Sequence, residues 1–262
     1  MVRRLWRIYK VFLSSSLARE LEFRANFIAK IFQNMIWIAW FLLVLFVIYR
    51  NTDSIAGWDW KEGAILAATT FLMSAIFGLF FRSLLEIPEQ VRKGGLDFVL
   101  TRPVDSQFWV SMRRFNYDQV GSFITGVVAL VYGVTHLERG ISLLQWSGFL
   151  VLGACAIAIF YSLNLCLMTL SIWFVRVDNL WVLSETVLDI SRFPIDIFNA
   201  GIRTALVYWI PLAFLATIPA RQIVLGFDGG MVLLGLGWAV CSLVFSRWFW
   251  RFALRFYTSA SS

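Results

Sequence analysis

The sequence predicts an all-α integral membrane protein with six transmembrane helices, an amphipathic N-terminal helix and a re-entrant extracellular hairpin. Of its 262 residues, 60% are hydrophobic and only 15% are charged, whereas an average soluble domain is about half apolar and about a quarter charged. Aromatic residues alone make up 17% of the chain. A soluble domain of this composition would expose large apolar patches. The composition therefore excludes a soluble globular protein, and it also excludes a disordered one.

The first 25 residues predict an amphipathic helix on the cytoplasmic surface of the membrane. Apolar side chains recur there at helical spacing, opposite a basic face. The apolar residues are Leu5, Tyr9, Phe12 and Leu13, and the basic ones are Arg3, Arg7 and Lys10. The segment lacks the continuous apolar run and the small-residue cleavage site of a signal peptide. We therefore expect its aromatic side chains to enter the acyl boundary and its basic side chains to face lipid phosphates.

Five segments have the apolar character of membrane-crossing helices, which need about 20 residues each. They are Phe27–Tyr49, Gly63–Phe81, Val120–Thr135, Ser147–Val175 and Met231–Trp250. The third segment is the shortest and contains three glycines, which favour close packing against a neighbouring helix. No repeat or low-complexity tract divides the chain. We therefore expect residues 1–262 to form a single domain.

The region between the fourth and the last of these segments is less regular. Val177–Phe198 has helical periodicity but carries five charged residues, and Thr204–Pro219 is apolar, short and interrupted by Pro211. We interpret the pair as one crossing helix followed by a re-entrant helical hairpin over residues 200–220. The alternative makes Thr204–Pro219 a seventh crossing.

The distribution of Lys and Arg favours six crossings. Fifteen of the 23 basic residues lie before the first segment, in the loop after the second, or near the C-terminus, whereas five lie on the other side. Basic residues accumulate in short cytoplasmic segments next to the membrane. Six crossings with both termini in the cytoplasm explain this bias, while a seventh would place the basic C-terminus outside. The net charge of +7 therefore reports topology and predicts no nucleic-acid partner.

The long loop after the second crossing carries the most informative motif. Pro88 suits the first turn of a short helix, and Gly94-Gly95 suits its termination. A second apolar turn, Leu96–Leu100, follows and ends before Pro103. A soluble partner could bind a short surface helix of this kind. The alternative is an ordered loop that has no partner.

A second group of charged residues lies in the fifth predicted crossing. Glu185, Asp189, Arg192 and Asp196 follow one another at spacings of four, three and four residues, which place them on one helix face. Charged groups at membrane depth face a bundle interior or a watery cavity, and Arg192 can pair locally with either aspartate. The surplus carboxylates could line a route for a cationic or polar substrate. Alternatively, they could fix a gate or a subunit contact.

Three features together resemble the type-two ABC exporter permeases, in particular their poorly characterised bacterial branch. They are the amphipathic N-terminal helix, the six crossings and the sequence Gly-Gly-Leu-Asp-x-x-Leu-x-Arg-Pro at Gly94–Pro103. The segment Arg192–Phe198 is a second element that is similar to the family. The resemblance covers nearly the whole chain.

The resemblance implies roles for individual residues. The loop 82–117 would contain the coupling helix that docks on an ATPase subunit, residues 1–25 would be the connector helix, and the hairpin 200–220 would be the extracellular gate. The residues implied in coupling are Glu86, Glu89, Arg92, Lys93, Gly94, Gly95, Asp97, Arg102 and Pro103. Those implied in the substrate pathway or the gate are Glu185, Asp189, Arg192, Pro194, Asp196 and Pro211.

The resemblance also implies partners. The chain lacks the sequence Gly-x-x-x-x-Gly-Lys-[Ser/Thr], whose backbone amides and lysine hold nucleotide phosphates. We therefore expect this chain to be no enzyme by itself and to bind no cofactor. ATP and Mg²⁺ would bind to two copies of a separate ABC ATPase subunit, beside a second permease that is the same or a different chain. The complex would lie in the bacterial inner membrane.

Other classes of function stay open at this point. An ion-coupled secondary transporter would use the carboxylates of the fifth crossing, although the internal repeats typical of that class are not visible. A membrane-embedded enzyme would need convergent acid–base or nucleophilic residues. His136 has no Cys or carboxylate at ligand spacing, so we expect no metal site and place it at a helix end. The substrate could be a lipid, a glycan, a peptide or an amphipathic drug.

Overall fold

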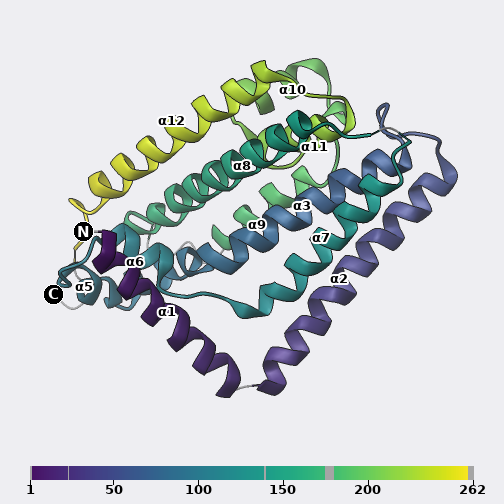
Figure 1. Cartoon of the computed structure of the whole chain (residues 1–262). Helices are drawn as coiled ribbons and strands as arrows, with labels where there is room; N and C mark the ends of the chain where they lie inside the picture. The colour runs from purple at the N-terminus through teal and green to yellow at the C-terminus, as the bar shows by residue number, and fades with distance from the viewer. Residues whose placement is uncertain (1, 23, 139, 175–179, 259–262) are drawn as a thin grey trace.

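A computed structural model describes residues 2–22, 24–138, 140–174 and 180–258. It is a bundle of helices (Figure 1), and the described residues contain no strand beyond an isolated bridge between Ile55 and Trp58. The predicted all-α class is therefore confirmed. Five helical segments are long and apolar enough to cross a membrane: Phe27–Asn51, Trp60–Arg92, Tyr117–Thr135, Leu143–Ile172 and Gly229–Ala253. They correspond to the five clear segments of the sequence.

The long helices begin at residues that can cap them. Their bounds are α1 Val2–Glu22, α2 Arg24–Asn51, α3 Trp60–Phe81, α7 Val120–Thr135, α8 Leu143–Thr169 and α12 Gly229–Ala253. Asp59 and Ser142 start α3 and α8 with capping boxes, so that two free backbone amides are satisfied at each start. Asp228 caps α12 by accepting a hydrogen bond from the Met231 amide. His136 caps the C-terminal end of α7, which confirms its expected place at a helix end.

Helices α3 and α8 form the centre of the bundle. Helix α7 packs along α3 and α12 packs along α8. Glycines permit both approaches: a Cβ atom at Gly126 would lie 3.2 Å from the backbone of Leu72, and one at Gly235 would lie 2.5 Å from the side chain of Leu152. Larger residues would therefore push these helices apart, as expected for small residues at helix contacts in membranes.

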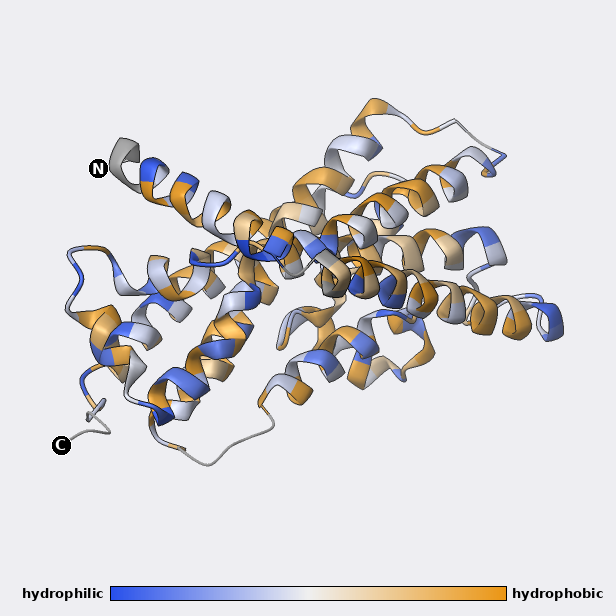
Figure 2. Ribbon diagram, turned by 90° about the horizontal axis from the view of Figure 1, so that it is seen from below, coloured by the Kyte–Doolittle hydropathy of each residue, from blue (hydrophilic) through white to orange (hydrophobic). Residues whose placement is uncertain are grey.

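The two ends of the bundle carry different short elements. One end, called the loop end below, holds α1, the last turns of α12, and the short helices α4 Ile87–Arg92, α5 Gly95–Leu100 and α6 Ser106–Met112. The opposite end, called the hairpin end, holds the α2–α3 connection, α10 Ala200–Tyr208 and α11 Thr217–Val224. Figure 2 shows mainly hydrophobic residues along the long helices and more hydrophilic residues towards their ends, as expected for a bundle that crosses a membrane.

Helix α1 packs on the protein differently from the sequence-based expectation. Phe12 was expected to enter the lipid boundary, but it is buried and makes an edge-to-face contact with Trp109 of α6, with 5.0 Å between ring centroids. The Ser16 hydroxyl accepts a hydrogen bond from the Phe115 amide at 3.1 Å. Apolar and polar contacts therefore join α1 to the long loop. Trp6, by contrast, is exposed.

The fifth predicted crossing contains a shorter helix than expected. Helix α9 spans Leu180–Ser191, which is 12 residues and about 18 Å of helix, short of the roughly 30 Å of a hydrocarbon core. Pro194 accounts for the early end, because a proline disfavours the helical conformation of the residue before it. The predicted start at Val177 lies outside the described residues.

The chain nevertheless passes from one end of the bundle to the other around α9. Before α9, Trp173 packs against Phe256 at the loop end, with 5.8 Å between ring centroids. After α9, the Asp196 carboxylate accepts a hydrogen bond from Trp58 at the hairpin end, at 2.9 Å. Helix α9 is therefore one part of a longer segment of chain that runs between the two ends of the bundle.

Residues 200–220 form a helical hairpin. Helix α10 leads through Pro211 and the 3₁₀ turn Leu212–Leu215 into α11, which is buried against α8 and α3. Arg203 near its start and Arg221 just beyond its end both pair with the Asp196 carboxylate, at 3.4 and 2.5 Å. The geometry brings both ends of the segment to the same carboxylate.

Candidate functional site

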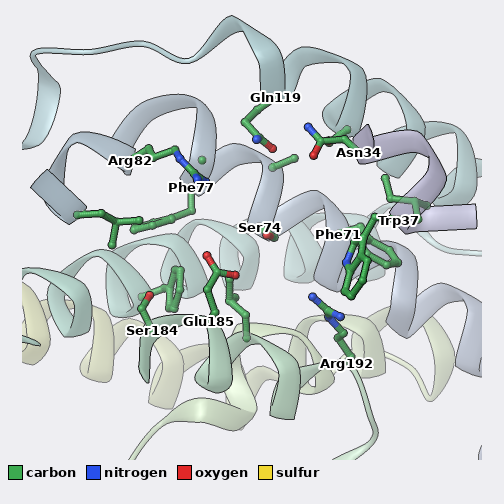
Figure 3. Close-up of a pocket in the computed structure, with 17 residues that line it drawn as sticks. Asn34, Trp37, Phe71, Ser74, Phe77, Arg82, Gln119, Ser184, Glu185 and Arg192 are labelled. Atoms are coloured by element: carbon green, nitrogen blue, oxygen red, sulfur yellow. The ribbon is translucent and has the colours of Figure 1, made fainter. Parts of the chain in front are cut away.

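A polar cavity lies inside the bundle between α2, α3, α9 and the turn that precedes α7 (Figure 3). Its inner chamber has a volume of about 170 Å³, and its outer chamber, towards the loop end, has a volume of about 760 Å³. The two chambers share lining residues from α2, α9, the turn before α7 and the 3₁₀ turn Arg82–Glu86 that follows α3. The shared residues are Asn34, Arg82, Leu85, Gln119 and Glu185.

Glu185 is the acidic side chain that both chambers share. Its neighbour Ser184 is buried and donates a hydrogen bond to Asn164 Oδ1 of α8 at 2.5 Å. This contact fixes the rotation of α9, and Figure 3 shows the Glu185 carboxylate in the cavity, on the side opposite Gln119. Glu185 has no ion-pair partner among the described residues. An unpaired carboxylate at membrane depth can attract a cation, a proton or a polar ligand.

Arg192 lies at the far end of the inner chamber and is held from several directions. Its guanidinium is 2.9 Å from Asp189, which confirms the predicted local pair. It also lies 5.7, 5.6 and 5.8 Å from the ring centroids of Trp37, Phe41 and Phe71, within the range of cation–π attraction. Asp189 itself is 58% exposed and does not line the cavity.

The outer chamber carries equal numbers of acidic and basic side chains. Most of them pair: Lys30 lies 3.6 Å from Asp118, Arg19 lies 3.9 Å from Glu20, and Arg114 contacts Glu86. Within the described part of the chain, Arg82 and Glu185 are left without an ion pair. Among the described residues, the cavity therefore offers the Arg82 guanidinium and the Glu185 carboxylate to a ligand.

The prediction that Asp196 shares one helix face with the other three charged residues is wrong. Helix α9 ends at Ser191, and Asp196 lies beyond Pro194 in the 3₁₀ turn Ile195–Ile197. Its carboxylate pairs with Arg221 and Arg203 instead of Arg192. The sequence spacing could not reveal this change, because both new partners come from the hairpin. Asp196 and the flanking Pro194 therefore belong to the hairpin end, with Pro211.

The loop after α3 is an ordered platform. Helices α4 and α5 meet at Gly94, whose φ angle of 67° lies in the left-handed region that glycine adopts readily. Pro88 lies in the first turn of α4, as predicted. Leu84, Ile87 and Leu96 are fully buried beneath these helices. The predicted helix, glycine break and second turn are therefore confirmed.

The outer face of this platform combines charges with one large apolar side chain. Lys93 pairs with Glu89 one turn away, at 2.6 Å. Arg92 is exposed, whereas Asp97 is half-buried. Phe98 of α5 is 73% exposed. Exposed aromatic side chains surrounded by charged ones are typical anchors of protein–protein interfaces.

The remaining predicted coupling residues shape this platform. The Arg102 guanidinium lies 4.0 Å from the ring centroid of Trp109, and its Nε donates to the Phe98 carbonyl at 3.3 Å. Arg102 thereby fixes the end of α5 before Pro103. Glu86 contacts both Arg113 and Arg114 across the loop. Burial, and then the neighbouring Arg114 and Arg19, lower the pKa of Arg113 to about 10.

A pair of charged side chains joins the platform to the last long helix. Asp105 caps α6 by accepting from the Phe108 amide at 3.0 Å, and both of its carboxylate oxygens accept from Arg247 of α12. These bonds to Arg247 hold the pKa of Asp105 below its usual value. Planar, two-point pairs of this type are among the strong charge-assisted hydrogen bonds. We refer to this contact as the Asp105–Arg247 clamp.

The clamp continues as a hydrogen-bond network into α8. Arg247 also donates to Gln107 Oε1 at 2.8 Å, and the Gln107 amide donates to the Tyr161 hydroxyl at 2.9 Å. That hydroxyl is 2.9 Å from the Ser111 hydroxyl. In addition, Trp250 of α12 donates to Ser106 at 3.1 Å. The platform is therefore fixed to α8 and α12 together.

Sequence reasoning did not identify Phe98, Arg82, Asp105 and Arg247 as site residues. A signal for Phe98 existed, because Leu96 and Val99 are three residues apart and define the buried face of a helical turn, which leaves Phe98 on the other face. In the sequence, Arg247 contributes only to the excess of basic residues that predicts the cytoplasmic side. Its pairing with Asp105 joins residues far apart in sequence, so no local pattern predicts it.

The fold and the site define a class: a multi-pass membrane protein with an internal polar cavity and an ordered platform at one end. The chain matches the family model described as "ABC-2 family transporter protein" over residues 35–261, and it belongs to that family. The resemblance found in the sequence is thereby confirmed. Searches of curated proteins and of solved structures found no match. ABC-2 permeases are membrane transport components, generally without catalysis of their own, and they typically work with an ATPase subunit.

Proposed function

We propose that this chain is the transmembrane permease subunit of an ATP-driven ABC exporter. It forms the substrate pathway and couples to a separate ATPase subunit that binds ATP and Mg²⁺. One combination of features carries the proposal. This chain belongs to a transporter family, has a polar cavity, and has an ordered platform that hydrogen bonds fix to two membrane-length helices. A pathway and a mechanical connection to a motor are the two parts that such a permease needs.

The platform is the proposed docking surface for the ATPase. Phe98 and the surrounding charges, Arg92 and Lys93, would contact the partner. Closure of two ATPase subunits around ATP would pull on α4 and α5, and the Asp105–Arg247 clamp would transmit the displacement to α12 and α8. Rigid-body motion of packed helices is a common form of such a transition.

The cavity is the proposed substrate pathway, and the hairpin is its proposed gate. Arg82 and Glu185 provide one positive and one negative group, which suits a polar or charged substrate. At the hairpin end, Asp196 joins both ends of the hairpin through Arg203 and Arg221. Breaking these pairs would release α10 and α11 from the passage around α9.

The topology is part of the same proposal. Six crossings would place both termini and the platform in the cytoplasm of a bacterial cell and the hairpin outside, in the inner membrane. The passage of the chain around α9 from Trp173 to Asp196 supports a sixth crossing. The complete complex would contain two ATPase subunits and a second permease, identical or different.

One observation favours a second candidate function. The unpaired Glu185 carboxylate in the cavity is the type of group that binds a proton or cation in an ion-coupled secondary transporter. That transporter would work without any ATPase. The two functions therefore differ in whether the purified chain moves its substrate along an ion gradient alone.

The experiment is affinity purification of the tagged chain from its native membranes, followed by ATP hydrolysis measurements. We expect a nucleotide-binding chain to co-purify and hydrolyse ATP, and Phe98→Asp to reduce its recovery by about tenfold or more, as for an interface hot spot. Trp209→Asp is the matched control, since Trp209 is equally exposed but lies at the hairpin end, where recovery stays unchanged. Transport driven by an ion gradient without any ATPase would contradict the proposal.

A further inference from the structure

A basic groove runs along one face of the last turns of α12. It has a volume of about 640 Å³ and lies next to the platform, since its Arg247 pairs with Asp105. Its lining residues follow one another along a single stripe of the helix, because they recur every third or fourth residue. They are Leu243, Val244, Arg247, Trp248, Arg251, Phe252 and Arg255.

The stripe changes character along the helix axis. It begins with the aliphatic side chains Leu243 and Val244, and beyond them arginines alternate with aromatic side chains: Arg247, Trp248, Arg251, Phe252 and Arg255. From Val244 to Arg251 the helix rises about 10 Å, and Arg255 lies two residues beyond the end of α12. The apolar start and the basic end match the two layers of one membrane leaflet, acyl chains and then headgroups. A phospholipid aligned with α12 would meet matching chemistry along its whole length.

Two of the three arginines are free to bind an anion. Arg247 is engaged by Asp105 and Gln107. Arg251 and Arg255 are exposed and have no ion-pair partner among the described residues. Asp105 is the carboxylate that Arg247 binds, and this contact neutralises it. Within the described part of the chain, Arg251 and Arg255 therefore remain uncompensated beside an apolar wall.

We propose that this groove binds an anionic phospholipid of the cytoplasmic leaflet, with its phosphate between Arg251 and Arg255 and an acyl chain against Val244 and Trp248. Basic pockets on the cytoplasmic side of transmembrane helices are suited to such headgroups. A second copy of the same face does not fit, because a two-fold contact would bring six arginines together. The inference extends the proposed function and rests on its topology, in which this end of α12 is cytoplasmic.

The site lies next to a connection that the transport cycle would use. Arg247 both lines the groove and holds Asp105 of the platform. A phosphate bound one turn further along α12 would hold the last turns of this helix in the leaflet. The headgroup would therefore stabilise the helix to which the platform is fixed.

The test is the amount of phospholipid that stays with the detergent-purified complex, measured by mass spectrometry after exchange with phosphatidylglycerol or phosphatidylcholine. We expect about one phosphatidylglycerol to be retained per chain in preference to phosphatidylcholine. The double variant Arg251→Gln/Arg255→Gln should bind phosphatidylglycerol about 30-fold more weakly. Arg251→Lys/Arg255→Lys, which keeps both charges, should retain most of the binding.

Two further variants test whether the lipid binds to this groove in particular or to any basic surface of the protein. Arg7→Gln/Lys10→Gln removes the same charge from exposed positions of α1 and should leave retention unchanged. Val244→Trp keeps every charge but fills the apolar part of the groove and should lower retention. Equal losses in the α1 variant and the α12 variant would overturn the proposal, as would retention that does not respond to Arg251→Gln/Arg255→Gln.

The remaining measurements distinguish a bound phospholipid from a free anion or a protein in the groove. Inorganic phosphate at millimolar concentration should leave phosphatidylglycerol bound; displacement by phosphate alone would show a free-anion site and overturn the proposal. ATPase recovery should not change in Arg251→Gln/Arg255→Gln. A loss of the ATPase with unchanged lipid would show a protein-docking face and also overturn it. Failure of the proposed function gives a different result, namely no ATPase in any sample while lipid retention still follows the groove variants.

Discussion

At each end of the bundle an aspartate pairs with arginine from another helix, but the two contacts connect different parts of the chain. At the loop end, Asp105 pairs with Arg247 and so joins the platform to a membrane-length helix. At the hairpin end, Asp196 pairs with Arg203 and Arg221, which are the two ends of one hairpin. The loop-end contact can transmit a displacement, whereas the hairpin-end contact can only hold a segment in place or release it.

The surroundings of the two contacts support this distinction. The Asp105–Arg247 clamp continues through Gln107 and Tyr161 into α8, so its load is shared by several bonds. At the hairpin end, Trp58 is the one further side chain that donates to Asp196 within the described part of the chain. A rigid coupling end and a releasable gate end are the arrangement that ATP-driven transport through the cavity between them would need.

The largest effect is expected from breaking the clamp. Asp105→Ala should reduce ATP-dependent transport by about tenfold or more, because a charge-assisted hydrogen bond contributes about 1.5–3 kcal/mol. ATP hydrolysis by the complex should persist, because the docking face around Phe98 is unchanged. Transport and hydrolysis measured in the same proteoliposomes check this. An equal fall in both would show that the clamp only maintains the fold.

A control for this prediction is the exchanged pair. Asp105→Arg/Arg247→Asp restores opposite charges at the same two positions and should recover part of the transport lost in the single variant. It also removes the cap of α6, since arginine cannot accept from the Phe108 amide, so recovery should be incomplete. Transport no better than in Asp105→Ala would contradict a role for the ion pair.

The next largest effect is expected at the hairpin end, where the variant should increase leakage instead of mainly reducing transport. Asp196→Asn weakens the pairs with Arg203 and Arg221 and should increase passive leakage of small polar solutes through the complex about three- to tenfold. ATP-dependent transport should fall less than in Asp105→Ala. Solute release from proteoliposomes without ATP measures the leak. A variant with impaired transport and no leak would contradict the gate.

A smaller effect should separate the two carboxylates of α9. Glu185→Gln should lower transport of the compound that the wild-type complex moves fastest by about three- to tenfold, since it removes the free charge of the cavity. Asp189→Asn is the matched control: Asp189 is more than half exposed and outside the cavity, so transport should change less than twofold. Both variants should assemble normally. Equal effects would contradict the assignment of Glu185 to the pathway.

The smallest expected effect is a change of thermal stability at acidic pH. Because Arg247 lowers the pKa of Asp105 in the folded chain below the ordinary value of 3.8, the clamp contributes its full stability above that pH and loses it as the pH falls through the lowered value. The thermal unfolding midpoints of the wild type and Asp105→Asn should therefore differ at neutral pH and converge as the pH falls below the lowered pKa of Asp105. A difference that grows in acid would contradict this account.

The sequence predicted most of the fold because its signals are local. Apolar length marks the five long helices, and the Pro88 and Gly94 positions mark the two helices of the platform. The re-entrant hairpin over residues 200–220 and the six crossings that the charge bias favours stay predictions. Glu185 and Asp189 also lie on α9 as expected, and Arg192 follows its last residue and pairs with Asp189.

The sequence could not predict contacts that depend on tertiary structure. Asp196 was placed with Arg192 on spacing alone, but Pro194 ends the helical pattern between them and two hairpin arginines take the carboxylate. Asp105 and Arg247 are more than 100 residues apart, and their pairing needs the packing of α12 on α8. Amphipathic spacing likewise could not distinguish lipid from the ring of Trp109 as the partner of Phe12.

The central claim is that ATP acting at the platform changes access to the cavity. Gln119→Cys, in a chain whose Cys155, Cys166 and Cys241 are replaced by Ser, places a thiol where both chambers meet. The measurement is its rate of labelling by a membrane-impermeant reagent from the loop end, in the assembled complex. We predict fast labelling without nucleotide and at least fivefold slower labelling with ATP and vanadate, a change that Asp105→Ala abolishes. Equal labelling rates in both nucleotide states would contradict the account.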